Sequence, residues 1–231
     1  MPKRLRIVGI VLLVIGLVLL ALGGVAYARV QDGYRTLQAF SVAQNVALSY
    51  DDQGRLTDRG TPEGAQAIMT LLTEDWAYPV VESDLDPADP VVNTATEYMY
   101  QMAAIAYHTL NSTQTVVLPE DVEYEGVPYK AGPYEFEVDG RYWTDFDRAH
   151  PIEGLAREQA WSGTAHGLIA ELGVGTVTHS TLQLGVALAA LYAVVGLTAI
   201  VGGLGLIWVA AAKRIPDTIP TSMLIEPVKT T

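Results

Sequence analysis

The feature that most constrains this chain is an apolar run of 22 residues without a charge, Ile7–Ala28. At 1.5 Å per residue, a helix of this length measures about 33 Å and matches a hydrocarbon core of roughly 30 Å. A second charge-free stretch covers 172–212, and its most apolar part is Leu184–Ala211. Because backbone groups find no water inside lipid, each run must be helical. The sequence therefore predicts a membrane protein with transmembrane α-helices at 7–28 and 184–211.

Basic residues next to both runs predict how the chain crosses the membrane. They stand just before the first run and just after the second: Lys3, Arg4, Arg6, Lys213 and Arg214. Cytoplasmic flanks are rich in lysine and arginine, so we expect a multi-pass plasma-membrane protein with both termini in the cytoplasm. Residues 1–6 are then the cytoplasmic N-terminus and 29–180 an extracytoplasmic domain. The proline-containing segment 212–231 is then a cytoplasmic tail, which we expect to be disordered.

The N-terminus also permits a second interpretation, a cleavable signal peptide. Ala26-Tyr27-Ala28 has the form of a cleavage site, and the preceding cations form a suitable n-region. The apolar run is longer than the usual h-region of about 7–15 residues. We therefore expect an uncleaved signal anchor.

Composition excludes several classes of protein. The chain contains no cysteine, which excludes a disulfide framework, a thiolate zinc site, an iron–sulfur cluster and a cysteine nucleophile. Its net charge of −12 argues against a nucleic-acid partner, because an acidic surface repels phosphate. Within 29–180 lie 24 of the 26 acidic residues and 8 of the 14 basic ones, a net charge of −16. A solvated surface explains this charge, and attraction of cations or a basic partner is the alternative.

The first half of the central segment, 34–112, is predicted to be mainly helical. Apolar residues at helical spacing in Tyr34–Ser49 can continue the first span outward. Thr61-Pro62-Glu63 is typical of a helix start, and Asp89-Pro90 resembles a second start. The methionines and tyrosines between Met99 and Leu110 predict one buried helix face.

The second half of the segment changes to a period of two. Tyr134–Val138 alternates apolar and acidic residues, and Asp139-Gly140 is a favoured two-residue turn after which Arg141–Trp143 can return. We predict a small antiparallel β-meander over 115–145 and a helix over 151–172. The fold class is therefore a pair of transmembrane α-helices that flank an α+β extracytoplasmic domain.

Four residues are candidates for a metal site made of histidine and carboxylate ligands. His150 lies near Asp147 and Glu153 in the sequence, and His166 could complete the set. Their spacing matches no zinc motif, and a structural role is the alternative for each. We expect no catalytic residue and no resident cofactor.

A dense acidic loop is a second place where a cation could bind. Its carboxylates are Glu82, Asp84, Asp86 and Asp89. Oxygen ligands at such spacing suit calcium, but prolines interrupt the loop and no glycine stands where an EF-hand turns. An exposed acidic linker is the other interpretation.

Both apolar runs carry a face of small residues. These faces are Gly9, Gly16 and Gly23 in the first run, and Gly185, Ala189, Ala193 and Gly196 in the second. Small residues let helices approach closely in lipid, so we expect these faces to bind another membrane protein or further copies of the chain. The absence of ionisable residues within either run argues against a transporter or ion pathway.

Two stretches resemble a group of actinobacterial proteins. Arg6–Gly16, and Val127-Pro128-Tyr129 to Gly132-Pro133-Tyr134 before the glycine-rich second span, are similar to small two-span membrane proteins of unknown function. Some of that group carry the label of an aromatic ring-opening dioxygenase, which implies iron held by two histidines and a carboxylate. The sequence shows no compact triad of this kind, so the resemblance implies the two-span architecture rather than that chemistry.

The sequence favours a membrane-anchored cell-envelope protein that is a non-enzymatic accessory, scaffolding or binding subunit. The alternative is a membrane-anchored hydrolase or metalloenzyme that uses His150 and His166. A pore-forming oligomer is the third possibility. Metal bound to the outer domain would favour the enzyme, and a co-purifying partner would favour the scaffold.

Overall fold

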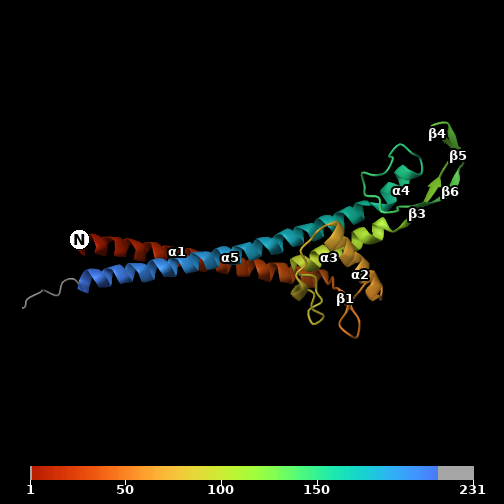
Figure 1. Cartoon of the computed structure of the whole chain (residues 1–231). Coiled ribbons are helices and arrows are strands. Elements are labelled where there is room, and N and C mark those ends of the chain that lie inside the picture. The colour runs from red at the N-terminus through yellow and green to blue at the C-terminus, as the bar shows by residue number, and fades with distance from the viewer. Residues whose placement is uncertain (1, 213–231) are drawn as a thin grey trace, which may run out of the picture. The chain divides into compact units, whose positions relative to one another are not determined.

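A computed structural model describes residues 2–212, and two long helices account for nearly half of it (Figure 1). These are α1, Pro2–Gln44, and α5, Gly163–Ala212, and both are long and apolar enough to cross a membrane. Contacts divide the chain into two compact units, Met1–Gln31 with Leu184–Thr231, and Asp32–Gln183. The prediction of two long apolar helices that flank a small domain with short antiparallel strands is confirmed. Lys213, Arg214 and the predicted tail lie outside the described residues.

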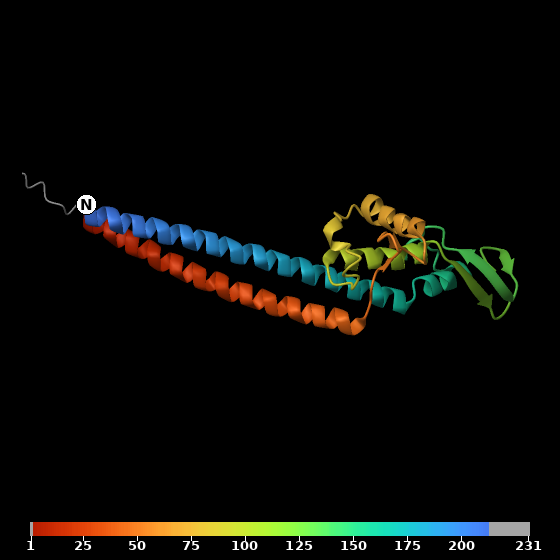
Figure 2. The same ribbon diagram turned by 90° about the horizontal axis from the view of Figure 1, so that it is seen from below.

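In the first unit, α1 and α5 lie side by side and antiparallel (Figure 2). Their closest approaches pair Gly9 with Gly203, Gly16 with Gly196, and Gly23 with Ala189, all of them buried. Both partners of each pair recur every seven residues, so one face of each helix meets the other repeatedly. A β-carbon added to Gly16 would lie only 2.5 Å from the Gly196 carbonyl oxygen. Glycine is therefore required for the helices to come this close.

Two short helices of the second unit begin with a threonine cap. In α2, Pro62–Thr70, the Thr61 hydroxyl accepts a hydrogen bond from the Gly64 backbone N–H, as its sequence predicts. The other, α3, Ala95–Leu110, begins later than the predicted start at Asp89-Pro90. Thr94 and Glu97 form a complete capping box there, so the prediction of a start at 89–90 is wrong.

The strands form three antiparallel pairs rather than one meander. The pairs are β1 with β2, Ser49–Tyr50 and Leu56–Thr57; β3 with β6, Thr113–Leu118 and Gly132–Glu137; and β4 with β5, Val122–Tyr124 and Val127–Tyr129. Strands β1 and β2, a π-helix at Leu71–Asp75 and a 3-10 turn at Glu82–Asp84 also interrupt the region 34–112, so helix covers less of it than predicted.

The predicted turn at Asp139-Gly140 exists, but the predicted return strand does not. Both turn residues have positive φ, 50° and 74°, and the Arg141 N–H donates to the Val138 carbonyl at 3.1 Å. Strand β6 pairs only with β3 within the described chain. The segment after the turn packs instead through its aromatic rings, because Tyr142 stacks on Trp161.

Gly140→Val is expected to destabilise the second unit by roughly 1 kcal/mol or more, because a β-branched residue is strained at positive φ. No described atom lies within 4 Å of the added β-carbon, so the effect comes from backbone conformation alone. Gly167→Val in α5, which also meets open space but lies at an ordinary helical φ, is the matched control. Thermal unfolding followed by near-ultraviolet circular dichroism measures the difference. An unchanged midpoint for Gly140→Val would contradict the turn.

The predicted helix over 151–172 is two helices in the structure. Helix α4 covers Glu153–Ala160, and α5 begins at Gly163 and continues without a break through Gly173–Gly175. A glycine inside a helix costs only about 1 kcal/mol, which packing elsewhere offsets. The glycines at 173 and 175 therefore do not interrupt α5 before the second apolar run.

Candidate functional site

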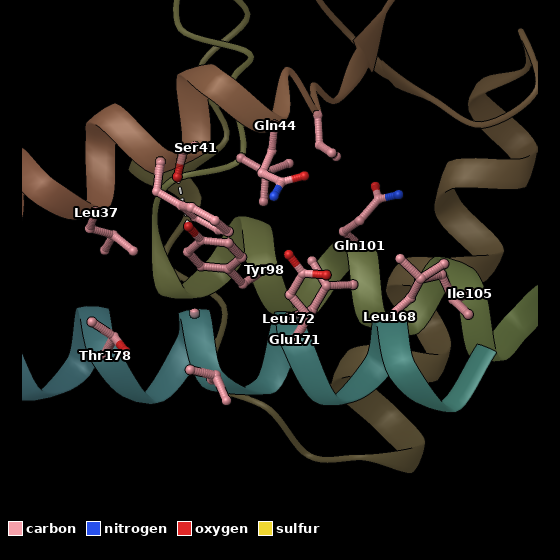
Figure 3. Close-up of a pocket in the computed structure, with 15 residues that line it drawn as sticks. Leu37, Ser41, Gln44, Tyr98, Gln101, Ile105, Leu168, Glu171, Leu172 and Thr178 are labelled. Atoms are coloured by element: carbon pink, nitrogen blue, oxygen red, sulfur yellow. Dashed lines mark hydrogen bonds between the residues drawn. The ribbon is translucent and has the colours of Figure 1, made fainter. Parts of the chain in front are cut away.

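The second unit contains an apolar pocket of about 560 Å³ (Figure 3). Its walls come mainly from three helices that are far apart in the sequence, the end of α1, the stretch 98–105 of α3 and the N-terminal part of α5, with Val46 and Val92 from the loops. The lining residues are Leu37, Phe40, Ser41, Gln44, Val46, Val92, Tyr98, Gln101, Ile105, Leu168, Glu171, Leu172, Val174, Gly175 and Thr178. A cavity of this size with mostly apolar walls and few polar groups is typical of small-ligand sites.

Packing around Tyr98 holds the three helices at the pocket. The Tyr98 hydroxyl and Ser41 Oγ are 2.7 Å apart in a buried hydrogen bond that links α3 to α1. On α5, Gly175 gives the same ring room, since an added β-carbon would lie 2.6 Å from Tyr98 Cε1. Tyr98 therefore joins all three walls, and a larger residue at 175 must displace it.

Three long polar side chains line the pocket, one from each helix; Gln44 and Glu171 are exposed, and Gln101 is half-buried. Gln44 comes from α1, Gln101 from α3 and Glu171 from α5, and Figure 3 shows them directed into the space between the helices. None of the three side chains has a hydrogen-bond or ion-pair partner within residues 2–212. Polar groups at a pocket usually fix a ligand's orientation, so these three are free to do so.

The predicted metal ligands are placed in two separate environments. His150 Nε2 is 3.0 Å from the Tyr129 hydroxyl, while its Nδ1 accepts the N–H groups of Ile152 and Glu153. Through Nδ1, His150 caps the first N–H groups of α4. Both ring nitrogens are therefore engaged within the chain. Among the described residues, no group of three His, Asp or Glu side chains is placed to hold a metal.

The two candidate carboxylates near His150 are also engaged in structural hydrogen bonds. Tyr124 donates to Asp147 at 2.7 Å, which lowers the pKa of that carboxyl and raises the pKa of Tyr124 to about 12. Glu153 accepts hydrogen bonds from Arg141 and from the Asp147 backbone. These contacts fix the loop before α4.

His166 lies in a second, shallower pocket of about 380 Å³ with aromatic walls. Its ring contacts Trp143 edge-on and Trp161 at a tilt, with centroids 5.0 and 5.9 Å away. Trp76 and Tyr142 complete these walls, and the Trp76 indole N–H donates to the Tyr142 hydroxyl. His166 is therefore an aromatic packing residue here, away from the contacts of His150.

In the acidic loop, the carboxylate of Asp86 accepts the Ala88 N–H, and Glu82–Asp84 forms the 3-10 turn. His108 pairs with Asp58 at 2.9 Å. Hydrogen bonding and the 3-10 turn thus account for these acidic residues, and pairing with Asp58 accounts for His108.

His179 is a buried side chain that the sequence did not single out as important. Its Nδ1 accepts the backbone N–H of Ala95, a donor that the first turn of α3 otherwise leaves free, and Tyr34 packs edge-on against its ring. Burial lowers the pKa of His179, although Asp84 opposes this effect. A protonated Nδ1 would lose the hydrogen bond, so the fold requires neutral His179.

Acid is therefore expected to destabilise the second unit through His179. As the pH falls below the free imidazole value of 6.5, the unfolded chain takes up the proton first, and stability decreases until folded His179 is protonated too. His179→Gln keeps an acceptor but does not titrate, so it should show a smaller loss of melting temperature between about pH 7.5 and about pH 5.5. Burial also raises the pKa of Glu97. The contribution of Glu97 to the pH dependence is present in both proteins and cancels when they are compared. Equal losses would contradict this role.

The predicted small-residue faces are used inside the chain. Gly9, Gly16 and Gly23 meet α5 directly, and Gly185 meets Val30 in the same helix pair. Gly203, which the sequence analysis missed, continues the face with the same seven-residue spacing. Association of these faces with a second protein stays a prediction.

Family models, curated proteins and solved structures gave no match to the chain. The resemblance to two-span actinobacterial proteins therefore stays a prediction.

Proposed function

We propose that the chain is a two-span plasma-membrane protein whose extracytoplasmic domain binds the alkyl chain of a lipid or similar amphiphile. The pocket of about 560 Å³ in the second unit carries this proposal. Its lining offers aliphatic and aromatic walls, two carboxamides and one carboxylate, and contains no nucleophile beside a base. Binding is therefore the function that it supports best, in keeping with an accessory or binding subunit rather than an enzyme.

The helices that form the pocket also favour a lipidic ligand. Both α1 and α5 contribute walls, and each is continuous in sequence with an apolar run long enough to span a bilayer. Thr178, at the pocket, comes shortly before Leu184, where the second run begins. A ligand drawn from the bilayer is thus the amphiphile that such a pocket would encounter most often.

The proposed topology follows from the basic flanks and is tested by cysteine labelling. The chain has no cysteine of its own, so Asp52→Cys in an exposed turn and Thr230→Cys each give one reactive site. In intact cells, an impermeant thiol reagent is expected to label position 52 and to spare position 230. Labelling at 230 alone would reverse the orientation, and labelling at neither position before lysis would contradict a two-span topology, because positions 52 and 230 would then lie on the same side of the membrane.

Alkyl-chain binding is tested by photolabelling in membranes. A long-chain alcohol that carries a diazirine is expected to label peptides from the pocket walls as well as the spans. Leu168→Trp places a large ring at the pocket, whereas Leu155→Trp changes an equally exposed leucine on α4, 40% against 44% exposed. Pocket labelling relative to span labelling should fall in Leu168→Trp and persist in Leu155→Trp. Labelling of the spans alone would overturn the proposal.

A further inference from the structure

The charge distribution of the pocket is one-sided. Glu171 is the only charged side chain in the lining, and no lysine, arginine or histidine accompanies it. It has no ion-pair partner within residues 2–212. The surrounding segment 29–180 has a net charge of −16, which adds to the negative potential there. A ligand's polar end therefore meets an uncompensated carboxylate.

The neighbouring polar groups suit the same kind of ligand. Gln44 and Gln101 each carry a carbonyl oxygen that accepts hydrogen bonds and an NH2 group that donates them, whereas the Glu171 carboxylate accepts only. An ammonium group has three N–H donors and no acceptor, so it matches one carboxylate and two amide oxygens. A hydroxyl can satisfy only part of this set, and a carboxylate or phosphate is repelled by Glu171.

We propose that the pocket prefers an amphiphile whose headgroup is a protonated amine, held by Glu171 with Gln44 and Gln101 while the alkyl chain lies along the apolar walls. This inference rests on the proposed function, because the same pocket holds the alkyl chain. It adds the headgroup chemistry, which the apolar walls alone do not determine.

The test compares two photoreactive probes that differ only in the headgroup. A diazirine-bearing long-chain amine and the matched alcohol are added to membranes that contain the full chain, and the labelled peptides are quantified. The amine is expected to label the pocket about two- to fivefold more than the alcohol, the range for one solvent-accessible ion pair. Glu171→Gln, which keeps the side-chain shape, should remove this preference without reducing labelling by the alcohol.

A charge-matched control separates the site from the overall charge of the domain. Glu123→Gln removes one exposed carboxylate on β4, away from the pocket lining, and should keep the preference for the amine. Equal labelling by both probes in the wild type would overturn the headgroup inference and leave alkyl-chain binding intact. A preference that survives in Glu171→Gln would overturn the assignment to Glu171. Failure of both probes to label the pocket would overturn the proposed function itself.

Discussion

Gly16→Leu is expected to separate the two apolar helices. The first atom of the new side chain would lie 2.5 Å from the Gly196 carbonyl oxygen and 2.7 Å from Ile200 Cγ1, where backbones already touch. The helices must move apart, and the packing lost should be on the order of 1–2 kcal/mol. The pair Gly23→Cys and Tyr192→Cys reports this separation, because their β-carbons would be 3.2 Å apart, just below the disulfide spacing of about 3.5–4.5 Å. Because Gly23 is itself a contact glycine, all yields are compared within this cysteine background. Disulfide yield should fall in the triple variant.

Gly24→Leu is the matched control for this experiment. Gly24 is in the same helix and closer to the cysteine pair, yet no described atom lies within 4 Å of its added β-carbon. Disulfide yield should therefore stay at the level of the cysteine pair alone. Equal yields in Gly16→Leu and Gly24→Leu would contradict the close glycine contact between α1 and α5.

Gly175→Val is expected to destabilise the second unit and to disturb the pocket. The added β-carbon would lie 2.6–2.7 Å from three atoms of the Tyr98 ring, which is fixed by its hydrogen bond to Ser41. Overpacking of this kind costs roughly 1–3 kcal/mol. A lower thermal midpoint by near-ultraviolet circular dichroism, together with reduced pocket photolabelling, is the expected result.

Gly173→Val provides the comparison, two residues earlier in the same helix. Its added β-carbon would meet only Met102 Cε, at 3.7 Å, which is an ordinary contact. Both variants make the same change in helix propensity, so their difference isolates the contact with Tyr98. Equal melting temperatures for the two variants would show that Tyr98 moves aside without cost.

Much of the secondary structure could be predicted from local signals. The charge-free runs gave the two long helices, and Thr61-Pro62 gave the start of α2. The start of α3 was missed, although Thr94 and Glu97 have capping-box spacing, because Asp89-Pro90 also resembles a helix start. The turn at Asp139-Gly140 was correct, but the path after it depends on the contact of Tyr142 with Trp161. Such a contact between distant segments leaves no periodic pattern.

The candidate site itself was not predicted, for the same physical reason. Gln44, Gln101 and Glu171 are about 60–70 residues apart in sequence and meet only when three helices pack. The glycine faces were visible as a repeat, but a repeat does not say which helix it contacts. The structure shows that the partner face is in the same chain, with Gly203 opposite Gly9. His150 was a candidate metal ligand because of its chemistry, yet it caps a helix. His179, which was no candidate, accepts a backbone hydrogen bond instead.

Native mass spectrometry of the chain, extracted in mild detergent, tests the central claim of alkyl-chain binding most directly. The wild-type protein is expected to keep the additional mass of a bound lipid after the micelle is removed. Leu155→Trp should keep the same mass, whereas Leu168→Trp, with its pocket obstructed, should lose it. A wild-type protein that carries no lipid, or a Leu168→Trp variant that retains it fully, would contradict the account.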